Sequence, residues 1–491
     1  MNKRYIIALD EGTTSVRTIL YDTKLNQIIA KSQKPFTQHY PKNGWVEQDA
    51  EEIWRCQKET LDEILSTINR EEVYGIGITN QRETVVAWDK LTGKPICNAI
   101  VWQCRRTSKM IDKLPLTIKK KIKSRTGLIP NAYFSASKIK WIFDNVPLAK
   151  KLLNKDQLCI GTVDSYLAFK LTGKHVTDPS NASRTMLYNI NTLEWDQELL
   201  DYFKIPEKCL PIVVDSNSEI GICNEYGFPL CGIIGDQQSS LVGQACFKKG
   251  MAKATFGTGC FILLNTGSDL IKTNNLLTTI AYTINGKTTY ALEGSIYSAC
   301  NAIDWLKDNL GVFHDYSEID TMCNSLSSNE GVYFVPAFTG LGAPYWDDST
   351  KGTIVGMTLA TDKRHIVRAC IESICYNTCA VAKSMSKKGI NIKELHVDGG
   401  GSKNKFLLQF QANTLQRAIL KSAISESTAM GAICMVGLNK KIFTLPSIEQ
   451  NYKILNTYMP EISLSERNKL YHKWENAIKT TKMEGKIRNE K

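Results

Sequence analysis

The chain carries YIIALDEGTTS at residues 5–15, a run of apolar residues that ends in an acid and a small polar loop. A continuous apolar run without polar alternation is typical of a strand buried on both faces. A second strand-like run follows at residues 16–21, so the loop from Glu11 to Ser15 joins the two strands of a hairpin. This beginning predicts an α/β domain with a polar loop at one edge of a sheet.

Strand and helix signals continue beyond the hairpin. Asp49 is a candidate N-cap, because apolar residues recur at helical spacing between Ile53 and Ile68. Residues 75–79 (GIGIT) have the pattern of another buried strand, which runs into the polar residues 80–83.

A related pattern returns in the second half of the chain. Residues 250–256 lead into Gly257-Thr258-Gly259 and a further apolar run. The later segments predict a strand at 289–292, a helix from about residue 301, a long helix at 363–388 and a strand at 394–397 that enters the loop 398–401. Because a strand–small loop–strand unit occurs in each half, we predict two α/β domains, residues 1–246 and 247–491, whose loops face each other across a cleft.

The composition excludes several protein classes. Of the 491 residues, 43% are hydrophobic and 22% are charged, as in an ordinary soluble protein. No window has the ~18 uncharged apolar residues of a membrane-spanning helix, and the N-terminus lacks the features of a signal peptide. A cytoplasmic protein is therefore expected.

The 15 cysteines are scattered, and the cluster Cys370, Cys375 and Cys379 has no second ligand pair, which favours buried reduced thiols over a metal site.

The formal net charge of +12 raises the hypothesis of nucleic-acid binding. The sharpest basic run, residues 119–123, has no interleaved aromatic residues on which bases stack. A solvated helix face explains that run better, and nucleic acid is not an expected partner.

The first loop has the composition of a phosphate cradle. Gly12, Thr13, Thr14 and Ser15 offer closely spaced backbone N–H groups and three hydroxyls, and glycine permits a close approach of the backbone. A plain hairpin turn is the alternative for this loop taken alone. Two neighbours and two further glycine loops strengthen the hypothesis: Arg17 as a positive donor, Asp10 as a strand-end carboxylate for Mg²⁺, and the loops 257–259 and 398–401 for the rest of a nucleotide.

Phosphoryl transfer to an alcohol also requires a base near the hydroxyl group. The chain has no GxxxxGK[ST] motif and no protein-kinase motif set, so the phosphate cradle belongs to another class. Asp236 follows the apolar run 230–234 and is the candidate base. The alternative is that Asp236 only caps a helix, and both roles are compatible.

Eight motifs occur in order along the chain: ALDEGTTSVR (8–17), GWVEQD (44–49), GITNQRET (77–84), AIVWQCRRT (99–107), GDQQ (235–238), TFGTGCF (255–261), PAFTGLGAPYWD (336–347) and DGGGSKNKFLLQFQ (398–411). In these motifs the chain resembles the FGGY carbohydrate kinase family, which has the actin/Hsp70-like ATPase fold. The resemblance runs from about residue 4 to about residue 440. It implies two actin/RNase H-like domains with the nucleotide and substrate between them. NQRET, VWQCRR and Tyr133-Phe134-Ser135 resemble the glycerol-specific branch more narrowly.

The resemblance implies ATP-dependent phosphorylation of glycerol to glycerol 3-phosphate, with Asp236 as the general base. An adjacent Arg82–Glu83 pair would offer donors and acceptors to an uncharged polyol without leaving a net charge, unless it is a surface ion pair. The aromatic residues would cover the C–H faces of glycerol, with plain core packing as the alternative. The implied site comprises Thr13, Thr14, Ser15, Arg17 and Thr258 at the phosphates, Asp10 at Mg²⁺, Gly400 and Asn404 at the adenosine, and Arg82, Glu83, Trp102, Tyr133, Asp236, Gln237 and Phe261 at glycerol.

Three residues depart from the family pattern. Glu11 stands where the family usually has Gln, and Cys300 and Asp304 stand where members often have Gly and Gln against the nucleotide. Two other hypotheses stay open: another polyol or ketose kinase of the same family, and a non-catalytic ATP-binding module on the same fold. Retention of Asp10 and Asp236 argues against the second. A homo-oligomer, either a dimer or a tetramer, is expected.

Overall fold

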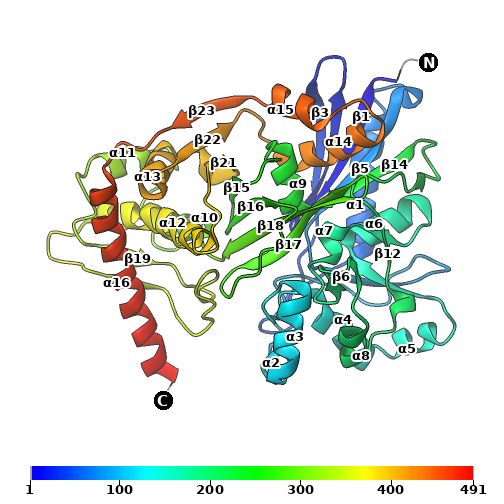
Figure 1. Ribbon diagram of the computed structural model, residues 1–491, viewed down its shortest axis with the longest axis horizontal. Helices are drawn as coiled ribbons and strands as arrows, with labels where there is room; N and C mark the ends of the chain where they lie inside the picture. Colours follow the sequence, from blue (N-terminus) through cyan, green and yellow to red (C-terminus); the bar gives the residue numbers. More distant parts are fainter. Residues whose placement is uncertain (1–2, 490–491) are drawn as a thin grey trace.

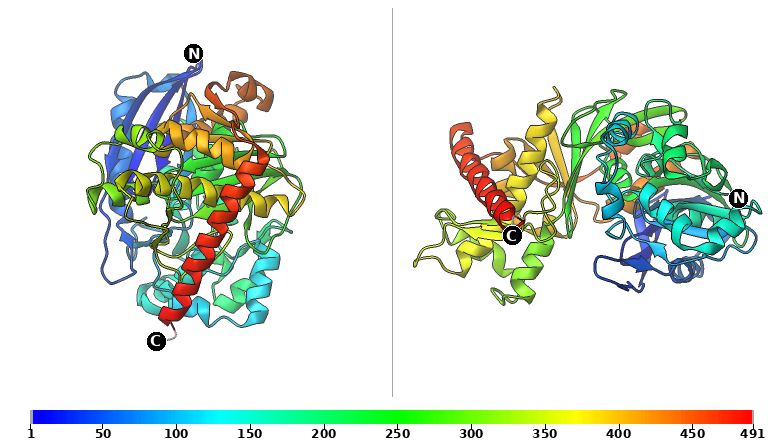
Figure 2. Two further views of the ribbon diagram at one scale, coloured as in Figure 1. Left: turned by 90° about the vertical axis from the view of Figure 1, so that its left-hand side faces the viewer. Right: turned by 90° about the horizontal axis from the view of Figure 1, so that it is seen from below.

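The computed structural model describes residues 3–489, which form two lobes side by side (Figures 1 and 2). The first lobe is built on a sheet with the strand order β13-β14-β5-β1-β2-β3. Strand β1 pairs antiparallel with β2 and parallel with β5, so the predicted hairpin is confirmed. The strands of this sheet are β1 (Tyr5–Glu11), β2 (Ser15–Asp22), β3 (Gln27–Pro35), β5 (Val73–Asn80), β13 (Gly221–Ile222) and β14 (Pro229–Gly235).

The second lobe repeats this arrangement in a sheet with the order β17-β18-β16-β15-β21-β22-β23. Strand β15 pairs antiparallel with β16 and parallel with β21, as β1 does with β2 and β5. The two loops predicted to bind phosphate therefore occupy equivalent hairpin turns. The strands are β15 (Met251–Phe256), β16 (Cys260–Gly267), β17 (Leu277–Ile284), β18 (Lys287–Ile296), β21 (Glu394–Asp398), β22 (Ala418–Ser422) and β23 (Ile454–Tyr458).

Smaller sheets and the helices surround these two sheets. A four-stranded sheet has the order β4 (Glu47–Gln48), β7 (Ala99–Ile100), β6 (Val85–Asp89) and β8 (Leu158–Thr162), and three strand pairs join β10 (Tyr188–Asn189) to β11 (Glu194–Trp195), β9 (Val176–Thr177) to β12 (Ile212–Val213), and β19 (Tyr333–Val335) to β20 (Thr353–Val355). The helices are α1 (Ala50–Leu65), α2 (Ser108–Asp112), α3 (Leu116–Thr126), α4 (Ser135–Asn145), α5 (Pro147–Leu153), α6 (Val163–Thr172), α7 (Pro179–Ala182), α8 (Gln197–Phe203), α9 (Asp236–Gly243), α10 (Cys300–Asp308), α11 (Glu318–Asn324), α12 (Lys363–Ser386), α13 (Lys405–Leu415), α14 (Ser427–Asn439), α15 (Leu445–Asn451) and α16 (Leu464–Asn489). None of the helices within residues 3–489 combines the length and the apolar character that crossing a bilayer demands.

Local signals explain where the predicted helices begin. The Asp49 side chain accepts a hydrogen bond from the Glu51 N–H and caps α1, as expected. Helix α12 begins at a capping box, in which Asp362 and His365 satisfy each other's backbone N–H groups. Its long buried face packs against the second sheet and α13.

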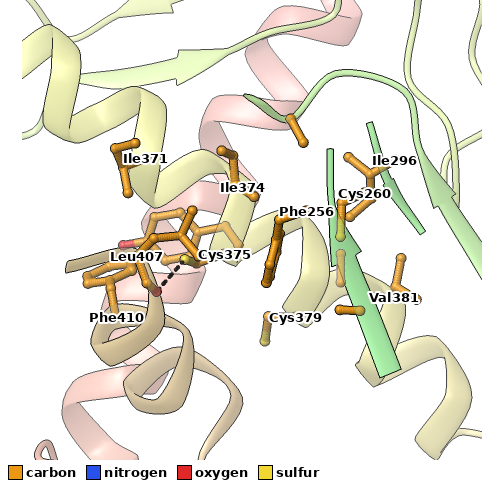
Figure 3. Packing of buried hydrophobic residues seen from close by; sticks show 14 of the residues in the cluster. Phe256, Cys260, Ile296, Ile371, Ile374, Cys375, Cys379, Val381, Leu407 and Phe410 are labelled. Atoms are coloured by element: carbon orange, nitrogen blue, oxygen red, sulfur yellow. Dashed lines mark hydrogen bonds between the residues drawn. The ribbon is translucent and has the colours of Figure 1, made fainter. Parts of the chain in front are cut away.

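The core of the second lobe contains the cysteine cluster (Figure 3). Cys370, Cys375 and Cys379 are buried and free, as predicted. The Cys375 thiol donates to the Leu407 carbonyl oxygen at 3.4 Å, and such thiols behave as small apolar side chains with a weak donor. Within residues 3–489 no group of three or more His, Cys, Asp or Glu residues is arranged to hold a metal ion.

Helix α14 comes late in the chain but packs against α9 and the strands β1, β5 and β14 of the first lobe. In Figure 1 this orange helix lies beside the blue strands of the first sheet. Two glycines permit the close crossing of α9 and α14. A Cβ atom on Gly243 would lie 1.9 Å from the Ser427 carbonyl oxygen, and one on Gly431 would lie 2.0 Å from the Ser239 carbonyl oxygen. The backbones therefore touch where the two helices cross.

We predict that Gly431→Ala destabilises the protein by about 1–3 kcal/mol or more, because overpacking against backbone atoms cannot be relieved by a rotamer change. Urea unfolding measures the change in the free energy of unfolding. Gly221→Ala is the matched control, since its Cβ would meet no atom closer than 3.7 Å. Equal stability of the two variants would contradict the close crossing.

Candidate active site

The first predicted phosphate loop joins β1 to β2. The Gly12 N–H donates to the Ser15 carbonyl oxygen at 3.0 Å and closes the turn. Thr14 is exposed at the tip, whereas the Thr13 hydroxyl accepts a hydrogen bond from Trp102 Nε1 at 3.0 Å. The Thr13 carbonyl oxygen also accepts from the Gln48 side chain at 2.8 Å. The loop is thus fixed from behind and open at its tip.

Asp10 and Arg17 face each other across the hairpin. Arg17 Nη1 lies 3.6 Å from Asp10 Oδ2 and 2.8 Å from Glu426 Oε2, where Glu426 directly precedes α14. Burial raises the pKa of Asp10 to about 6, although the Arg17 guanidinium acts in the opposite direction. A buried carboxylate of this kind fits a hard cation such as Mg²⁺, which binds one or two carboxylates together with substrate phosphates.

Glu11 is fully buried beside Asp10. Its Oε1 accepts from Gln81 Nε2 at 2.8 Å, while its Oε2 has no hydrogen-bond partner within the described part of the chain. Burial raises the pKa of Glu11 well above its usual range. The folded chain therefore keeps the Glu11 proton to higher pH than an exposed glutamate does, and in that protonated form the side chain resembles the neutral Gln of the family pattern.

Asp236 is the first residue of α9, and Gly235 rather than Asp236 occupies the N-cap position. Its Oδ1 accepts from the Gln237 N–H at 2.6 Å and lies 3.2 Å from Arg82 Nε. Among the described residues, its Oδ2 has only a long contact of 3.4 Å from Gln237 Nε2, and the side chain is 28% exposed. One carboxylate oxygen is thus held, and the other is accessible.

Arg82 and Glu83 are both buried, which excludes a surface ion pair. Glu83 has a φ of +64°, the left-handed turn that lets two adjacent side chains leave the end of β5 toward the same site. Each of them has a buried ionic partner elsewhere in the chain. Arg82 binds Glu293 at 2.6 and 3.2 Å, and Glu83 accepts from Arg184 Nε at 2.6 Å.

The predicted aromatic residues gather around Trp102. Its ring centroid lies 5.5 Å from that of Tyr133 and 6.5 Å from that of Phe261, both edge-to-face. Phe261 comes from β16 of the second lobe, so the cluster spans both halves of the chain. Tyr133 also belongs to an apolar core cluster, so core packing accounts for part of its role. Trp102 connects this cluster to Thr13 of the first loop.

The second loop and the predicted adenosine end lie on the second lobe. Thr258 is exposed in the turn between β15 and β16. Gly399 has a φ of +83° and lies so close to Phe256 that a Cβ would be 2.5 Å from the Phe256 carbonyl oxygen. The Asn404 side chain caps α13 by accepting from the Leu407 N–H at 2.6 Å. Among the described residues, no hydrogen bond joins Thr258, Gly400 or Asn404 to Asp236.

Cys300 and Asp304, the two residues of the second lobe that depart from the family pattern, each lie close to another residue of this lobe. Cys300 begins α10, and its sulfur would lie 2.6 Å from a Cβ on Gly401. Asp304 accepts a hydrogen bond from the Tyr316 hydroxyl at 2.8 Å.

Sequence analysis missed Arg184, Glu293 and Lys253. Lys253 is fully buried on β15 and donates to the Gln237 side-chain oxygen and to Thr255 Oγ1. Burial lowers its pKa, against the effect of nearby Asp398 and Asp236. Lys253 and Glu293 each interrupt an apolar strand with a single charge. That charge was the sequence feature that could have revealed them as functional residues. Arg184 lies in a turn after α7 and gave no such signal.

A cavity of about 400 Å³ lies elsewhere, between the β2–β3 hairpin and helices α14 and α15. Tyr21, Met430, Phe443 and Tyr452 are among its lining residues, and none of the predicted site residues is. It is therefore separate from the candidate active site.

Comparisons with known proteins give consistent matches. The N-terminal domain of the FGGY family of carbohydrate kinases matches residues 5–243, and the C-terminal domain of that family matches residues 252–438. The chain is 48% identical over 484 residues to a protein named glycerol kinase from Thermococcus gammatolerans, covering 97% of this chain and 98% of that one. It is 48% identical over 487 residues to glycerol kinase 2 from Sulfolobus acidocaldarius, covering 98% of each.

Solved structures agree with these matches. The crystal structure of Plasmodium falciparum glycerol kinase with ADP has a TM-score of 0.91 at 35% identity, covering 98% of this chain and 99% of that chain. A xylulose kinase from Rhodospirillum rubrum has a TM-score of 0.88 at 20% identity, covering 98% of this chain and all of that chain. The second match shows a shared fold alone.

We predict that Glu11→Gln stabilises the protein increasingly as the pH rises. The unfolded chain ionises Glu11 near its usual pKa of 4.5, whereas the folded chain keeps the proton to higher pH. The folded state then binds more protons, so its stability falls with rising pH, and Gln removes that loss. The difference in Tm between the variant and the unmodified protein should grow by a few degrees from pH 5 to pH 8. Exposed Glu194→Gln is the control, and a pH-independent difference would refute the prediction.

Proposed function

The chain belongs to the FGGY family of carbohydrate kinases, and we propose that it transfers the γ-phosphoryl group of ATP to glycerol, giving glycerol 3-phosphate. The full-length similarity to proteins named glycerol kinase supports this choice over other family members. The geometry of Asp236 supports the chemistry: Oδ1 is fixed by the Gln237 N–H, and Oδ2 is accessible beside Arg82.

The substrate site offers both donors and acceptors. Arg82 Nε faces Asp236, Nη1 donates to Gln238 and Glu293, and Nη2 donates once to Glu293, which leaves one of the five guanidinium N–H groups for a substrate hydroxyl. Arg184 binds Glu83 through Oε1, so Oε2 is available as an acceptor. A site that satisfies hydroxyl groups in this way rejects substrates that lack them, because its polar groups would stay unpaired.

The aromatic cluster completes the substrate site. Trp102, Tyr133 and Phe261 present ring surfaces to the C–H faces of the polyol, and Gln237 lies beside the base. Since Phe261 comes from the second lobe, closure of the lobes would exclude water that otherwise hydrolyses ATP.

In the transfer step, Asp236 Oδ2 accepts the proton of the terminal hydroxyl as its oxygen attacks the γ-phosphorus and the bond to ADP breaks. Such transition states are loose, so positioning and electrostatic stabilisation supply most of the rate enhancement. The partly exposed position of Asp236, in contact with Arg82 through its other oxygen, suits both requirements.

The nucleotide would lie along the two loops. We assign Thr13, Thr14, Ser15 and Arg17 to one side of the triphosphate and Thr258 to the other, with Gly400 and Asn404 at the adenosine. Asp10 would hold Mg²⁺, which neutralises charge on the β- and γ-phosphates when bound. We also propose the division into domains 1–246 and 247–491. A homo-oligomeric state and a cytoplasmic location stay predictions.

We predict that the protein releases ADP from Mg-ATP only when glycerol is present, and that Asp236→Asn lowers kcat by about 10²–10⁴-fold, the usual contribution of a positioned general base. A coupled assay of ADP release measures both. Exposed Asp269→Asn is the control, because Asp269 pairs only with a surface lysine.

Three outcomes decide between the hypotheses. Turnover with a pentulose but none with glycerol would assign the chain to a sibling kinase of the same family. Nucleotide binding without turnover on any acceptor would indicate a non-catalytic ATP-binding module. Full activity of Asp236→Asn with glycerol would remove Asp236 from the role of base.

A further inference from the structure

We propose that Glu293 and Arg184 are positioning residues for the polyol site, and that together they set the orientation of Arg82, Glu83 and Tyr133. This inference rests on the proposed function, because it treats those three residues as the substrate contacts. Neither Glu293 nor Arg184 was singled out by its sequence pattern.

Glu293 reaches the site from β18 of the second sheet and has no exposed surface. Its carboxylate receives Arg82 Nη1 at 2.6 Å and Nη2 at 3.2 Å, and Arg184 Nη2 at 3.0 Å. Burial opposes its ionisation, but the Arg184 and Arg82 guanidiniums outweigh this and lower its pKa to about 2. One ionised carboxylate therefore holds two arginines from the other lobe.

Arg184 also has no exposed surface and contacts four side chains. Its Nε donates to Glu83 Oε1 at 2.6 Å, and its Nη2 donates to Glu293. Its guanidinium lies over the ring of Tyr133, 5.8 Å from the centroid, and over that of Phe134 at 5.3 Å. A single side chain thus fixes the acceptor carboxylate and one aromatic wall of the proposed substrate site.

The arrangement also decides how Arg82 meets the base. Arg82 Nε is already 3.2 Å from Asp236 Oδ1, while the fork of the guanidinium is directed to Glu293. Without the charge of Glu293, Asp236 competes for that fork, because its Oδ1 already lies 3.2 Å from Arg82 Nε. A forked pair there would occupy both Asp236 oxygens, including Oδ2, the one proposed to take the proton. Glu293 therefore keeps Arg82 beside the base without closing it off.

If Glu293 and Arg184 only stabilised the fold, their substitution would have a different effect. Buried ion pairs are weak contributors to stability, and breaking any of them leaves an uncompensated charge. Such damage lowers Tm and the yield of folded protein, but it does not act selectively on one of two substrates. A selective change in the kinetics of the polyol is the signature of positioning.

The test is Glu293→Gln, which keeps the shape and removes the charge. We expect the KM for glycerol to rise about 10- to 100-fold, the range for losing a hydrogen bond to a charged group. We expect kcat to fall as well, because Arg82 then occupies Asp236. The KM for ATP should stay within about twofold, because within residues 3–489 no hydrogen bond or ion pair joins Glu293 to the nucleotide loops. Arg184→Lys should raise the KM for glycerol in the same selective way, since lysine keeps the charge but not the fork.

The matched control is Glu372→Gln, which breaks another buried ion pair, Arg368–Glu372 on α12, with a separation of 2.7 Å. It should lower Tm without a selective change in the KM for glycerol. If Glu293→Gln does not fold, Glu293→Asp replaces it, because Asp retains the charge but shortens the reach. The KM for glycerol is again expected to rise selectively. Equal effects of the Glu293 variant and the Glu372 control, or unchanged kinetics with glycerol, would overturn the inference.

The unmodified protein is assayed first with glycerol and with other polyols and ketoses. Absence of turnover with glycerol refutes the proposed substrate, and the variants are then measured on the acceptor that the protein does use. Selective loss on that acceptor supports the positioning role, and kinetics unchanged from the unmodified protein refute it. Failure of the proposed substrate and failure of the positioning role therefore give different results.

Discussion

A carboxylate without exposed surface, Glu293, lies between the guanidiniums of Arg82 and Arg184 and joins the second sheet to the first half of the chain. An ion removed from water costs several kcal/mol unless an opposite charge meets it with good geometry. Glu293 comes from the second sheet and both arginines come from the first half of the chain. These charges are therefore satisfied across the two halves of the chain, which also meet where Phe261 contacts Trp102.

The repeated sheet topology explains why the chemistry gathers at one edge. In each lobe a hairpin strand pairs with a parallel neighbour, so the carboxyl ends of those strands point the same way. In the first sheet, Asp10 is the last residue but one of β1, Arg82 follows β5 and Asp236 follows β14. In the second sheet, Thr258 follows β15. Open α/β sheets place ligands outside the carboxyl ends of their strands, which is where the predicted site residues of each sheet lie.

Much of the local structure could be predicted because its causes are local. The apolar run at residues 5–9, the cap at Asp49 and the long helix 363–386 each follow from a pattern of neighbouring residues. The candidate site was predictable where a carboxylate or a glycine loop ended a strand, as at Asp10 and Asp236. The φ of +64° at Glu83 shows how adjacent side chains at the end of a strand come to face the same site.

The amino-acid sequence by itself determined the strands, the loops and the residue types that bring charge and hydroxyl groups to their ends, because each of these depends on contacts within a few residues. Only the tertiary structure decided which charged side chains form ion pairs with one another. Arg82 and Glu83 are adjacent, yet their partners are Glu293 and Arg184, separated from them by 211 and 101 positions. Ion pairing acts through space, and in a buried region the partner is set by how the sheets pack, which no local pattern encodes.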